Sequence, residues 1–329
     1  MNLSTQGNNG PMSKVVNNIN DNKKIAVIGD LNCDLVATGL ATGPLLGQEI
    51  LAKDFQMTLG GSATIFACGV ARLGNTVTFI SLIGMDEFGN FCLNGLRQAG
   101  ISTDNIMRKE GTRTGATISL STQEDRAFVT YLGAIAELSY EQLPISVLEG
   151  HSHLHMAAYF LHQKLRPSFP KIFSQAKHYG LTTSFDPNSD PAHQWQDDIQ
   201  DVLKQVDILF VNEVEAVHLT RQQNVDVSLK RLGQIVPCVV VKLGKKGAIA
   251  IRDDEITFAS GYEVNAIDTT GAGDSFAAGF VHAYLKGKTL QECLRMGNAC
   301  GALSTLKVGG TLGQPDCQTL NQFLTSVSL

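Results

Sequence analysis

Short apolar segments alternate with longer helix-compatible stretches along this chain of 329 residues, and that alternation constrains its fold more than any other feature. Residues 24–29 form an apolar run that ends at a glycine, which is typical of a buried strand. Residues 62–74 then carry apolar side chains at helical spacing, with Ser62 placed to cap the start and Gly74 the end. Strands that alternate with helices of ten or more residues predict right-handed βαβ units and a parallel sheet covered on both faces.

The same rhythm continues into the C-terminal third of the chain. Further strands are expected at residues 77–83, 154–158, 181–185, 207–211 and 238–243, and helices at residues 88–99 and 168–178, after residue 212 and at residues 276–285.

Two stretches, about 36–59 and 115–131, break the rhythm, because they have the character of β segments with no helix between them. In the second stretch Thr117 and Ser119 alternate with Ile118, as in a sheet with one face in water. We interpret the two stretches as a small β lid over one edge of the main domain.

Charge and hydropathy exclude several classes of function. The chain has a net charge of −5 and no basic patch beyond isolated pairs such as Lys245 and Lys246, so neither nucleic acid nor an anionic membrane is an expected partner. No apolar run reaches the roughly 18 residues that a membrane span needs. Seven scattered cysteines without a C-x-x-C pair, and an N-terminus without a signal-peptide core, favour a cytoplasmic protein with reduced thiols. Residues 1–23 are rich in Asn and are predicted to be disordered, with the folded domain at 24–329.

The strongest chemical signal is a glycine-rich turn that leads directly into an apolar helix. Residues 265–276 have the sequence Asn-Ala-Ile-Asp-Thr-Thr-Gly-Ala-Gly-Asp-Ser-Phe. Gly271 and Gly273 let the backbone approach an anion and point N–H groups at it, and the helix N-terminus adds roughly half a positive charge. Such an anion hole suits a phosphoryl group in transfer, which needs positioning and charge neutralisation more than covalent chemistry.

Asp274 stands in the first turn of that helix, where it would face both the anion and an incoming hydroxyl. There it can accept the hydroxyl proton as a general base, an effect usually worth about 10²–10⁴ in rate. The alternative is that Asp274 only caps the helix and the glycines make a tight turn. An isolated Gly-Ala-Gly-Asp favours the cap, whereas the whole string and its neighbours favour the base.

The string from Asp268 to Phe276 resembles the C-terminal motif of the ribokinase family of carbohydrate kinases, also named the PfkB family. Other stretches resemble family motifs in the same order: Gly60-Gly61 before the first helix, a Gly-x-Asp-x-x-Gly turn at 83–89, Asn-x-x-Glu at 212–215 and a nucleotide-strand motif at 242–247. The similarity spans about residues 24–315. It implies a ribokinase-like three-layer α/β/α core with a small β-sheet lid, and ATP-dependent phosphorylation of a primary hydroxyl.

The resemblance also implies roles for single residues on the phosphate side. Asp274 would be the base, and the anion hole would be formed by Gly271, Ala272 and Gly273. ATP would lie near Lys242, Gly244, Gly247 and Asn298. Mg²⁺ would be organised through water by Asn212 and Glu215. A monovalent cation, usually potassium, would be held by Asp268 and Thr270.

Without the family resemblance, the Asn-x-x-Glu pattern is weak evidence for a Mg²⁺ site, because a helix N-terminal cap with an acidic first turn has the same spacing.

Asn32 and Asp34 match the family's sugar ligands, and Gly60 and Gly61 complete the predicted sugar site. A carboxamide and a carboxylate two residues apart on an extended segment point the same way and can grip a diol. The alternative interpretation is that Asn32 and Asp34 are only the polar end of a strand.

The chain departs from ribokinases at positions that touch the sugar. Ser62 and Ile65 stand where ribokinases have Lys and Asn, and residues 158–160, Ala-Tyr-Phe, replace an acidic ligand, so ribose is disfavoured. Residues 184–188, Ser-Phe-Asp-Pro-Asn, are more similar to the fructokinase and 2-keto-3-deoxygluconate kinase branch. The Arg that usually follows there is absent, which favours a neutral sugar. An apolar wall of Tyr159, Phe160 and Ile65 would instead suit a nucleoside base.

Three functions therefore stay open: a sugar kinase, a nucleoside kinase of the same family, and a non-catalytic metabolite-binding relative. The intact string at 271–274 speaks against the last, because a sensor has no need of a base. A homodimer through the lid is expected, since exposed lid edges and apolar lid faces commonly pair.

Three histidines, His151, His153 and His155, alternate along a predicted strand. Three parallel side chains do not converge on one metal ion without a bulge. We therefore interpret them as polar outward positions of a strand that enters the core, with a metal site as the alternative.

Overall fold

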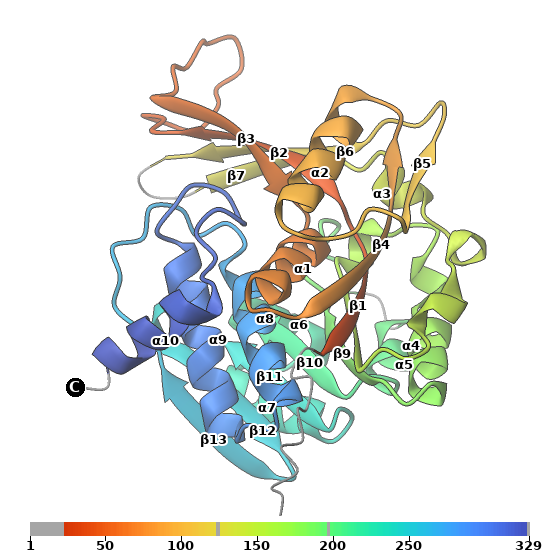
Figure 1. Ribbon diagram of the computed structural model, residues 1–329. Coiled ribbons are helices and arrows are strands. Elements are labelled where there is room, and N and C mark those ends of the chain that lie inside the picture. Colours follow the sequence, from red (N-terminus) through yellow and green to blue (C-terminus); the bar gives the residue numbers. More distant parts are fainter. Residues whose placement is uncertain (1–22, 123–125, 196–197, 328–329) are drawn as a thin grey trace, which may run out of the picture.

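The computed structural model describes residues 23–122, 126–195 and 198–327, so the disorder predicted for residues 1–23 falls almost entirely outside the described residues. Within that part of the chain the strands form a nine-stranded sheet, in the order β13-β12-β11-β10-β9-β8-β1-β4-β5, and a four-stranded sheet, in the order β3-β2-β6-β7 (Figure 1). The predicted α/β core with a separate β lid is confirmed. No helix in the described ranges is long and apolar enough to cross a membrane.

The strands of the large sheet are β1 (Lys24–Ile28), β4 (Thr76–Gly84), β5 (Ile106–Lys109), β8 (His153–Ala157), β9 (Thr182–Asp186), β10 (Ile208–Asn212), β11 (Cys238–Lys242), β12 (Gly247–Arg252) and β13 (Glu255–Ser260). The lid strands are β2 (Asn32–Thr38), β3 (Asp54–Gly60), β6 (Gly115–Ser121) and β7 (Arg126–Tyr131). The α-helices are α1 (Ser62–Arg72), α2 (Glu87–Gln98), α3 (Ala134–Glu137), α4 (Phe169–His178), α5 (Ile199–Leu203), α6 (Glu213–Thr220), α7 (Val225–Gly233), α8 (Ala272–Leu285), α9 (Leu290–Ser304) and α10 (Cys317–Ser326).

The large sheet is mixed, and the prediction of a wholly parallel sheet is wrong at one edge. β1 pairs in parallel with β4 and β8, but β12 pairs antiparallel with both β11 and β13. A two-residue turn at Asp253 and Asp254, with φ angles of 52° and 63°, joins β12 to β13. Both angles lie in the left-handed region that a tight hairpin requires, so no helix is needed between these strands.

Helices cover both faces of the sheet, and β1 shows how one strand supplies two cores. Ile25 and Val27 pack in the layer that contains α1 and α8, whereas Ala26 and Ile28 pack in the layer that contains α4 and α7. All four side chains are fully buried. A central parallel strand is therefore apolar at every position and not at alternate ones.

The start of α1 is capped by a residue distant in sequence, not by Ser62 as expected. The carboxylate of Asp30, just beyond β1, accepts hydrogen bonds from the backbone N–H groups of Ser62 and Ala63, each at 2.9 Å. Gly61 precedes the helix with φ 99°, a left-handed backbone that disfavours side chains. The Ser62 hydroxyl is thereby available for other contacts, while Gly74, with φ 84°, follows the helix end as predicted.

The histidines of β8 are buried, so the expectation of outward polar positions is wrong. His153 hydrogen-bonds the hydroxyls of Thr182 and Ser184, both at 2.7 Å, and His155 hydrogen-bonds Ser184 at 2.8 Å. The ring of His155 also stacks on Phe66 at 3.6 Å. Hydroxyls of the neighbouring strand make this burial possible, and no cluster suited to a metal ion occurs in the described ranges.

The lid sheet has two chemically different faces. Strand pairing places Asn32 and Asp34 on one face with Thr117 and Thr130, and this inner face is polar. Strand β2 of the lid begins at residue 32, four residues before the stretch 36–59 that was expected to form the lid.

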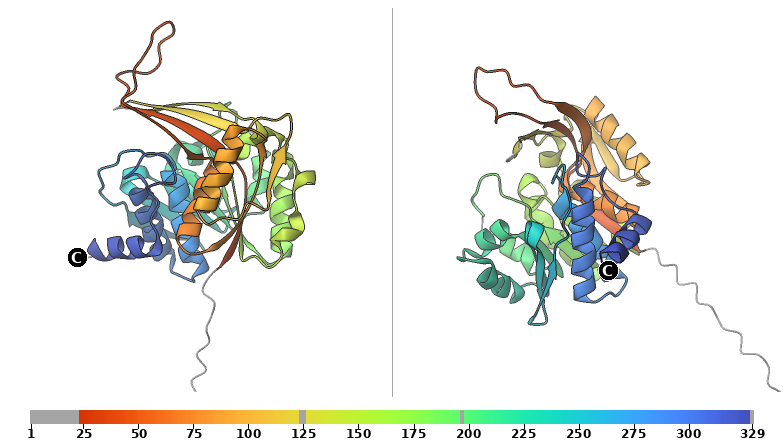
Figure 2. Two further views of the ribbon diagram at one scale, coloured as in Figure 1. Left: turned by 45° about the horizontal axis from the view of Figure 1, so that its top comes forward. Right: turned by 90° about the vertical axis from the view of Figure 1, so that its left-hand side faces the viewer.

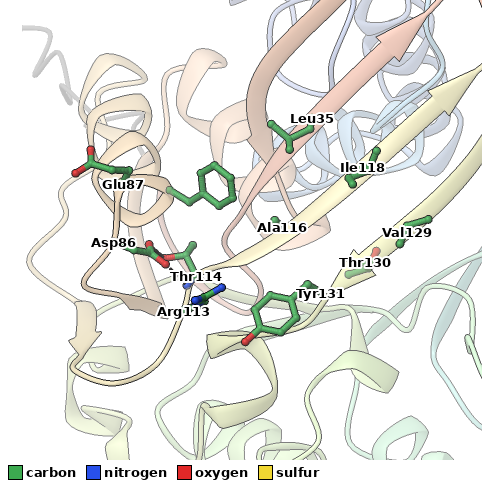
Figure 3. Close-up of a pocket in the computed structure, with 11 residues that line it drawn as sticks. Leu35, Asp86, Glu87, Arg113, Thr114, Ala116, Ile118, Val129, Thr130 and Tyr131 are labelled. Atoms are coloured by element: carbon green, nitrogen blue, oxygen red, sulfur yellow. Dashed lines mark hydrogen bonds between the residues drawn. The ribbon is translucent and has the colours of Figure 1, made fainter. Parts of the chain in front are cut away.

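The opposite, outer face is apolar and incompletely covered. Ile118, Val129 and Tyr131 are 40%, 59% and 56% exposed, so α2 covers only part of it. A cavity of about 740 Å³ lies between this outer face and the start of α2 (Figure 3). The long connection between β2 and β3 extends away from the body in both views of Figure 2.

Candidate active site

The glycine-rich turn and Asp274 lie at the start of α8, which begins four residues earlier than the helix expected at 276. Gly271 is its N-cap residue and has φ 69°, in the left-handed region, so the residue type is required by the backbone. The amides that follow belong to the first turn, where N–H groups have no partner within the helix. An anion placed against Ala272 and Gly273 would meet those N–H groups and the positive end of the helix dipole.

Asp274 is buried, 9% exposed, and it makes no capping box with the start of its own helix. Burial raises the pKa of its carboxyl to about 8, with the negative charges of Asp186 and Asp30 adding to the rise. Lys242 and a hydrogen bond from Ser62 act in the opposite direction. A carboxylate with a raised pKa is a stronger base than an exposed one, so its surroundings suit proton abstraction.

Lys242 lies against the same turn. Its ammonium pairs with the Asp186 carboxylate at 2.5 Å, and a Cβ added to Gly273 would stand 3.2 Å from Lys242 Nζ. Burial alone would lower the pKa of Lys242, but Asp186, Glu215 and Asp274 together hold it above its ordinary value. Lys242 is therefore an ammonium cation, paired with Asp186, next to the predicted anion hole.

This cluster forms where three neighbouring parallel strands end. β9 ends at Asp186, β10 at Asn212 and β11 at Lys242, and the three strands are adjacent in the sheet. Ligands of open α/β sheets bind outside the carboxyl ends of the strands. Sequence reasoning did not identify Asp186 as a site residue, although its position as the last residue of a buried strand was a usable signal.

Asn212 and Glu215 make a capping box at the start of α6. The Asn212 side chain accepts from the Glu215 N–H, and the Glu215 carboxylate accepts from the Asn212 N–H, each at 2.8 Å. The helix N-terminal cap that was the alternative interpretation of this motif is thus present. Glu215 is also buried, which raises its pKa against the opposing effect of Lys242. Its carboxylate and that of Asp186 are oxygen donors of the kind that a water-mediated Mg²⁺ would need, so the residues fit such an ion.

The remaining residues predicted to bind the nucleotide each have a role in stabilising the fold. The Asn298 amide donates to the carbonyls of Ala259 and Ser260, at 3.0 and 3.1 Å, and so ties α9 to β13. Gly244 opens a tight turn with φ 58°, and a Cβ on Gly247 would stand 2.1 Å from the Ala259 carbonyl oxygen. Contact of these three residues with ATP stays a prediction.

The predicted sugar residues are brought together on the inner face of the lid. Asn32 Nδ2 donates to Asp34 Oδ1 at 2.7 Å and to Thr117 Oγ1 at 3.2 Å. Burial raises the Asp34 pKa to about 7 against the Asn32 hydrogen bond, with Asp30 and Asp268 adding to the rise. Gly60 is required by this carboxylate, because an added Cβ would stand 1.9 Å from Asp34 Oδ1.

The apolar wall that we considered for a nucleoside base is not formed. Tyr159 is 1% exposed and packs edge-on against Phe169 and Phe185 in the core. Ile65 is also buried, and its side chain fills the space next to Gly271 and Gly310. This part of the nucleoside hypothesis is therefore wrong, since these side chains face the interior.

Asp268 and Thr270, predicted to hold a monovalent cation, form one hydrogen-bonded unit. Asp268 Oδ1 accepts from the backbone N–H and the hydroxyl of Thr270, at 2.9 and 2.8 Å. Arg126 of the lid also reaches this unit, with Nη1 3.8 Å from Asp268 Oδ1. Sequence reasoning missed Arg126, because nothing local relates it to a turn more than a hundred residues away.

Comparison with known proteins gives consistent results over almost the whole chain. Residues 22–317 match the profile of the pfkB family carbohydrate kinases. The chain is similar to a ribokinase of Haemophilus influenzae, with 31% identity over 92% of this chain and 98% of the relative. It is also similar to the 2-dehydro-3-deoxygluconokinase of Bacillus subtilis, with 29% identity over 83% and 88% of the two chains. A probable fructokinase-2 of Arabidopsis thaliana matches with 28% identity over 92% and 96%.

Among solved structures, a putative ribokinase II from E. coli in complex with ATP and Mg²⁺ superposes with a TM-score of 0.82. Its sequence is 25% identical, and the match covers 92% of this chain and 99% of that one.

Proposed function

The chain belongs to the pfkB family of carbohydrate kinases, and we propose that it transfers the γ-phosphoryl group of Mg·ATP to a primary hydroxyl of a small neutral sugar. One observation carries this proposal. A buried carboxylate, Asp274, lies at the N-terminus of a helix whose first turn is flanked by the Lys242 ammonium. Base, anion site and fixed positive charge are thus assembled within one cluster.

The proposed reaction begins with the acceptor hydroxyl beside Asp274. The Asp274 carboxylate takes the hydroxyl proton as the hydroxyl oxygen bonds to the γ-phosphorus and the bond to the ADP oxygen breaks. The amides of Ala272 and Gly273 and the charge of Lys242 face the negative charge on the transferred group. Bound Mg²⁺, organised through Asn212 and Glu215, would neutralise charge on the phosphate oxygens.

We place the acceptor between the inner lid face and Asp274. Asn32 and Asp34 offer it amide and carboxylate groups, and Gly60 and Gly61 lie beside them. The polar inner face supports a sugar. Ser62, Ile65 and residues 158–160, which replace polar ribokinase ligands, disfavour ribose. Residues 184–188 favour a fructokinase-like or 2-keto-3-deoxygluconate kinase-like acceptor. The absence of an Arg after residues 186–188 favours a neutral sugar within that branch.

The cofactors of the proposed reaction are ATP and Mg²⁺. At Asp268 and Thr270, where the resemblance implies potassium, the Arg126 guanidinium already lies within reach, so we do not include potassium among the required cofactors. We place the reaction in the cytoplasm, which suits the seven free cysteines of the chain.

We also propose a homodimer formed through the outer face of the lid. That face exposes Ile118, Val129 and Tyr131 around the 740 Å³ cavity, and a second copy would cover them. Val129→Glu should convert the dimer into a monomer in light scattering. Val227→Glu, on the exposed side of α7, is the control that should stay dimeric. A wild-type monomer at micromolar concentration would contradict the proposal.

An ADP-release screen over hexoses, pentoses, sugar acids and nucleosides tests the function. Fructose or a related neutral sugar should give the highest kcat/KM, with ribose well below it. A nucleoside as best acceptor would establish the nucleoside kinase instead. Tight binding of one metabolite, without ATP consumption over the whole panel, would establish the non-catalytic relative.

A further inference from the structure

The position of the anion-hole turn depends on the carboxylate of Asp268. Besides Thr270, this carboxylate accepts a hydrogen bond from the Gly309 N–H at 2.8 Å, and so joins the turn to a second loop. That loop also touches the turn directly, because a Cβ on Gly271 would stand 2.9 Å from Gly310 Cα. The Asp268 side chain is 5% exposed, so its carboxylate is buried within the turn that leads into the predicted anion hole.

The cation that faces this charge within the described chain comes from the lid. Arg126 is the first residue of β7, and its pairing with Ser121 places it on the polar inner face with Thr130. Its guanidinium lies over the ring of Phe128, at 5.1 Å from the centroid. From there Nη1 reaches Asp268 Oδ1 at 3.8 Å and the Thr270 hydroxyl at 3.4 Å.

The lid also contacts the loop at Gly309 and Gly310, which itself touches the turn. A Cβ on Gly309 would stand 2.7 Å from Thr58 Cγ2, and Thr58 belongs to lid strand β3. The Asp268 carboxylate thus holds Gly309 against one lid strand while Arg126 approaches it from another. In Figure 1 the lid sheet lies directly above the C-terminal loops that carry these contacts.

We propose that Arg126 is a positioning residue that places its guanidinium on Asp268 and Thr270 when the lid is closed, and that it takes the place of a monovalent cation there. The guanidinium balances the buried carboxylate and holds the 268–273 turn in the shape that receives the phosphoryl group. The turn is then complete only while the lid covers the acceptor. This inference rests on the proposed kinase function, which it deepens.

Two substitutions at position 126 and a control elsewhere test the inference. Arg126→Gln removes the charge, Arg126→Lys keeps it without the planar fork, and Arg97→Gln changes an exposed arginine of α2 that bonds Asn94. Activity is measured with the best acceptor in KCl and in tetramethylammonium chloride at equal ionic strength, so that screening is the same.

Wild type and Arg97→Gln should have a kcat that is the same in both salts within about twofold. Arg126→Gln should lose roughly 10-fold to 100-fold in tetramethylammonium and recover most of it in KCl, because potassium can then occupy the position behind the turn. Arg126→Lys should lie between them. A wild type that itself needs potassium overturns the inference, as does full activity of Arg126→Gln without potassium. A loss that potassium does not restore overturns the replacement of one cation by the other.

A second measurement separates this inference from the proposed function. The Tm of Arg126→Gln should be higher in KCl than in tetramethylammonium chloride, by a few degrees, whereas the wild-type Tm should not respond. No acceptor is needed for this readout. If the acceptor screen fails and this difference is present, the proposed function fails alone. If both proteins respond equally to potassium, the role of Arg126 fails alone.

Discussion

The two halves of the proposed site each contain a buried carboxylate with a raised pKa, about 7 for Asp34 and about 8 for Asp274, but they are supported in different ways. Asp34 lies on a lid strand of seven residues. Asn32 donates a hydrogen bond to its carboxylate, which occupies the space that a side chain at Gly60 would fill. Asp274 lies on the 14-residue helix α8, which packs against α1 and α9 in the core.

The difference suggests a division of roles. The groups that we propose for phosphoryl transfer lie on the sheet and helix layers of the core. The groups that we propose for acceptor selection lie on a small sheet whose outer side is partly uncovered. Catalytic sites on helices and strands keep their geometry better than sites on loosely supported segments. Variants of Asp34 and of Asp274 should therefore affect different kinetic constants, whereas Arg126 belongs to the lid but contacts the turn before α8.

The largest effect is expected from Asp274→Asn. The amide keeps the shape of the side chain but cannot take a proton, so kcat should fall by about 10³-fold or more while ATP and sugar binding change little. Single-turnover rates and ligand titrations measure the two effects separately. Asp201→Asn, which removes an exposed carboxylate paired with Lys204, is the matched control. Near-normal turnover by the 274 variant would remove the base from the proposed mechanism.

Lys242→Met should lower kcat by roughly 100-fold and raise the KM for ATP, with the KM for the sugar unchanged. It also leaves Asp186 buried without its partner, at a cost of about 3–5 kcal/mol in the free energy of unfolding. Thermal unfolding records that cost. Lys242→Met combined with Asp186→Asn should recover part of the stability but not the activity. If the double variant recovered kcat, Lys242 would have no role beyond balancing Asp186.

On the lid side, Asp34→Asn should raise the sugar KM by about 10-fold to 100-fold and leave the ATP KM within about twofold. The amide replaces an acceptor of sugar hydroxyl protons by a group that competes with them. Initial rates at saturating ATP, with the sugar varied, give the comparison. An equal rise of both KM values would show that Asp34 does not act on sugar binding alone.

The smallest effect is expected from Ser62→Ala, and it concerns pH. Asp274 acts as a base only when deprotonated, so kcat/KM should rise with pH through its pKa, which burial raises to about 8 in the free enzyme. The Ser62 hydrogen bond lowers that pKa, so its removal should move the rising limb to higher pH. Activity at pH 7 should fall a few-fold and return to the wild-type value above about pH 9. A limb that moved to lower pH would contradict the assigned hydrogen bond, and Ser102→Ala, an exposed serine, should not shift it.

Local sequence patterns predicted much of the fold and singled out Asp274, the residue that we propose as the base. The strand and helix rhythm placed β1, α1, β4, α4 and α8 to within a few residues, because each is set by its own apolar period. The antiparallel edge was missed because residues 247–260 were not predicted to form strands, although the short Asp253-Asp254 turn between them was a usable signal of a hairpin.

Residues that act through distant partners were not predictable in the same way. Asp30 serves α1 from the end of β1, and Arg126 reaches Asp268 from another sheet. The burial of His153 depends on hydroxyls of the adjacent strand β9, which no pattern within β8 indicates. In each case the partner lies on another element of the fold, so only the tertiary structure shows the contact.

The two-faced lid sheet has one more consequence, which concerns enzyme concentration. The sheet is a single layer, so Asp34 and its neighbour Leu35 project from opposite sides of the same few ångströms of backbone. A second subunit seated against Leu35 would also limit the twisting of the strand that presents Asp34 to the acceptor. If the proposed dimer forms, diluting the enzyme until the subunits separate should weaken sugar affinity and leave ATP affinity unchanged.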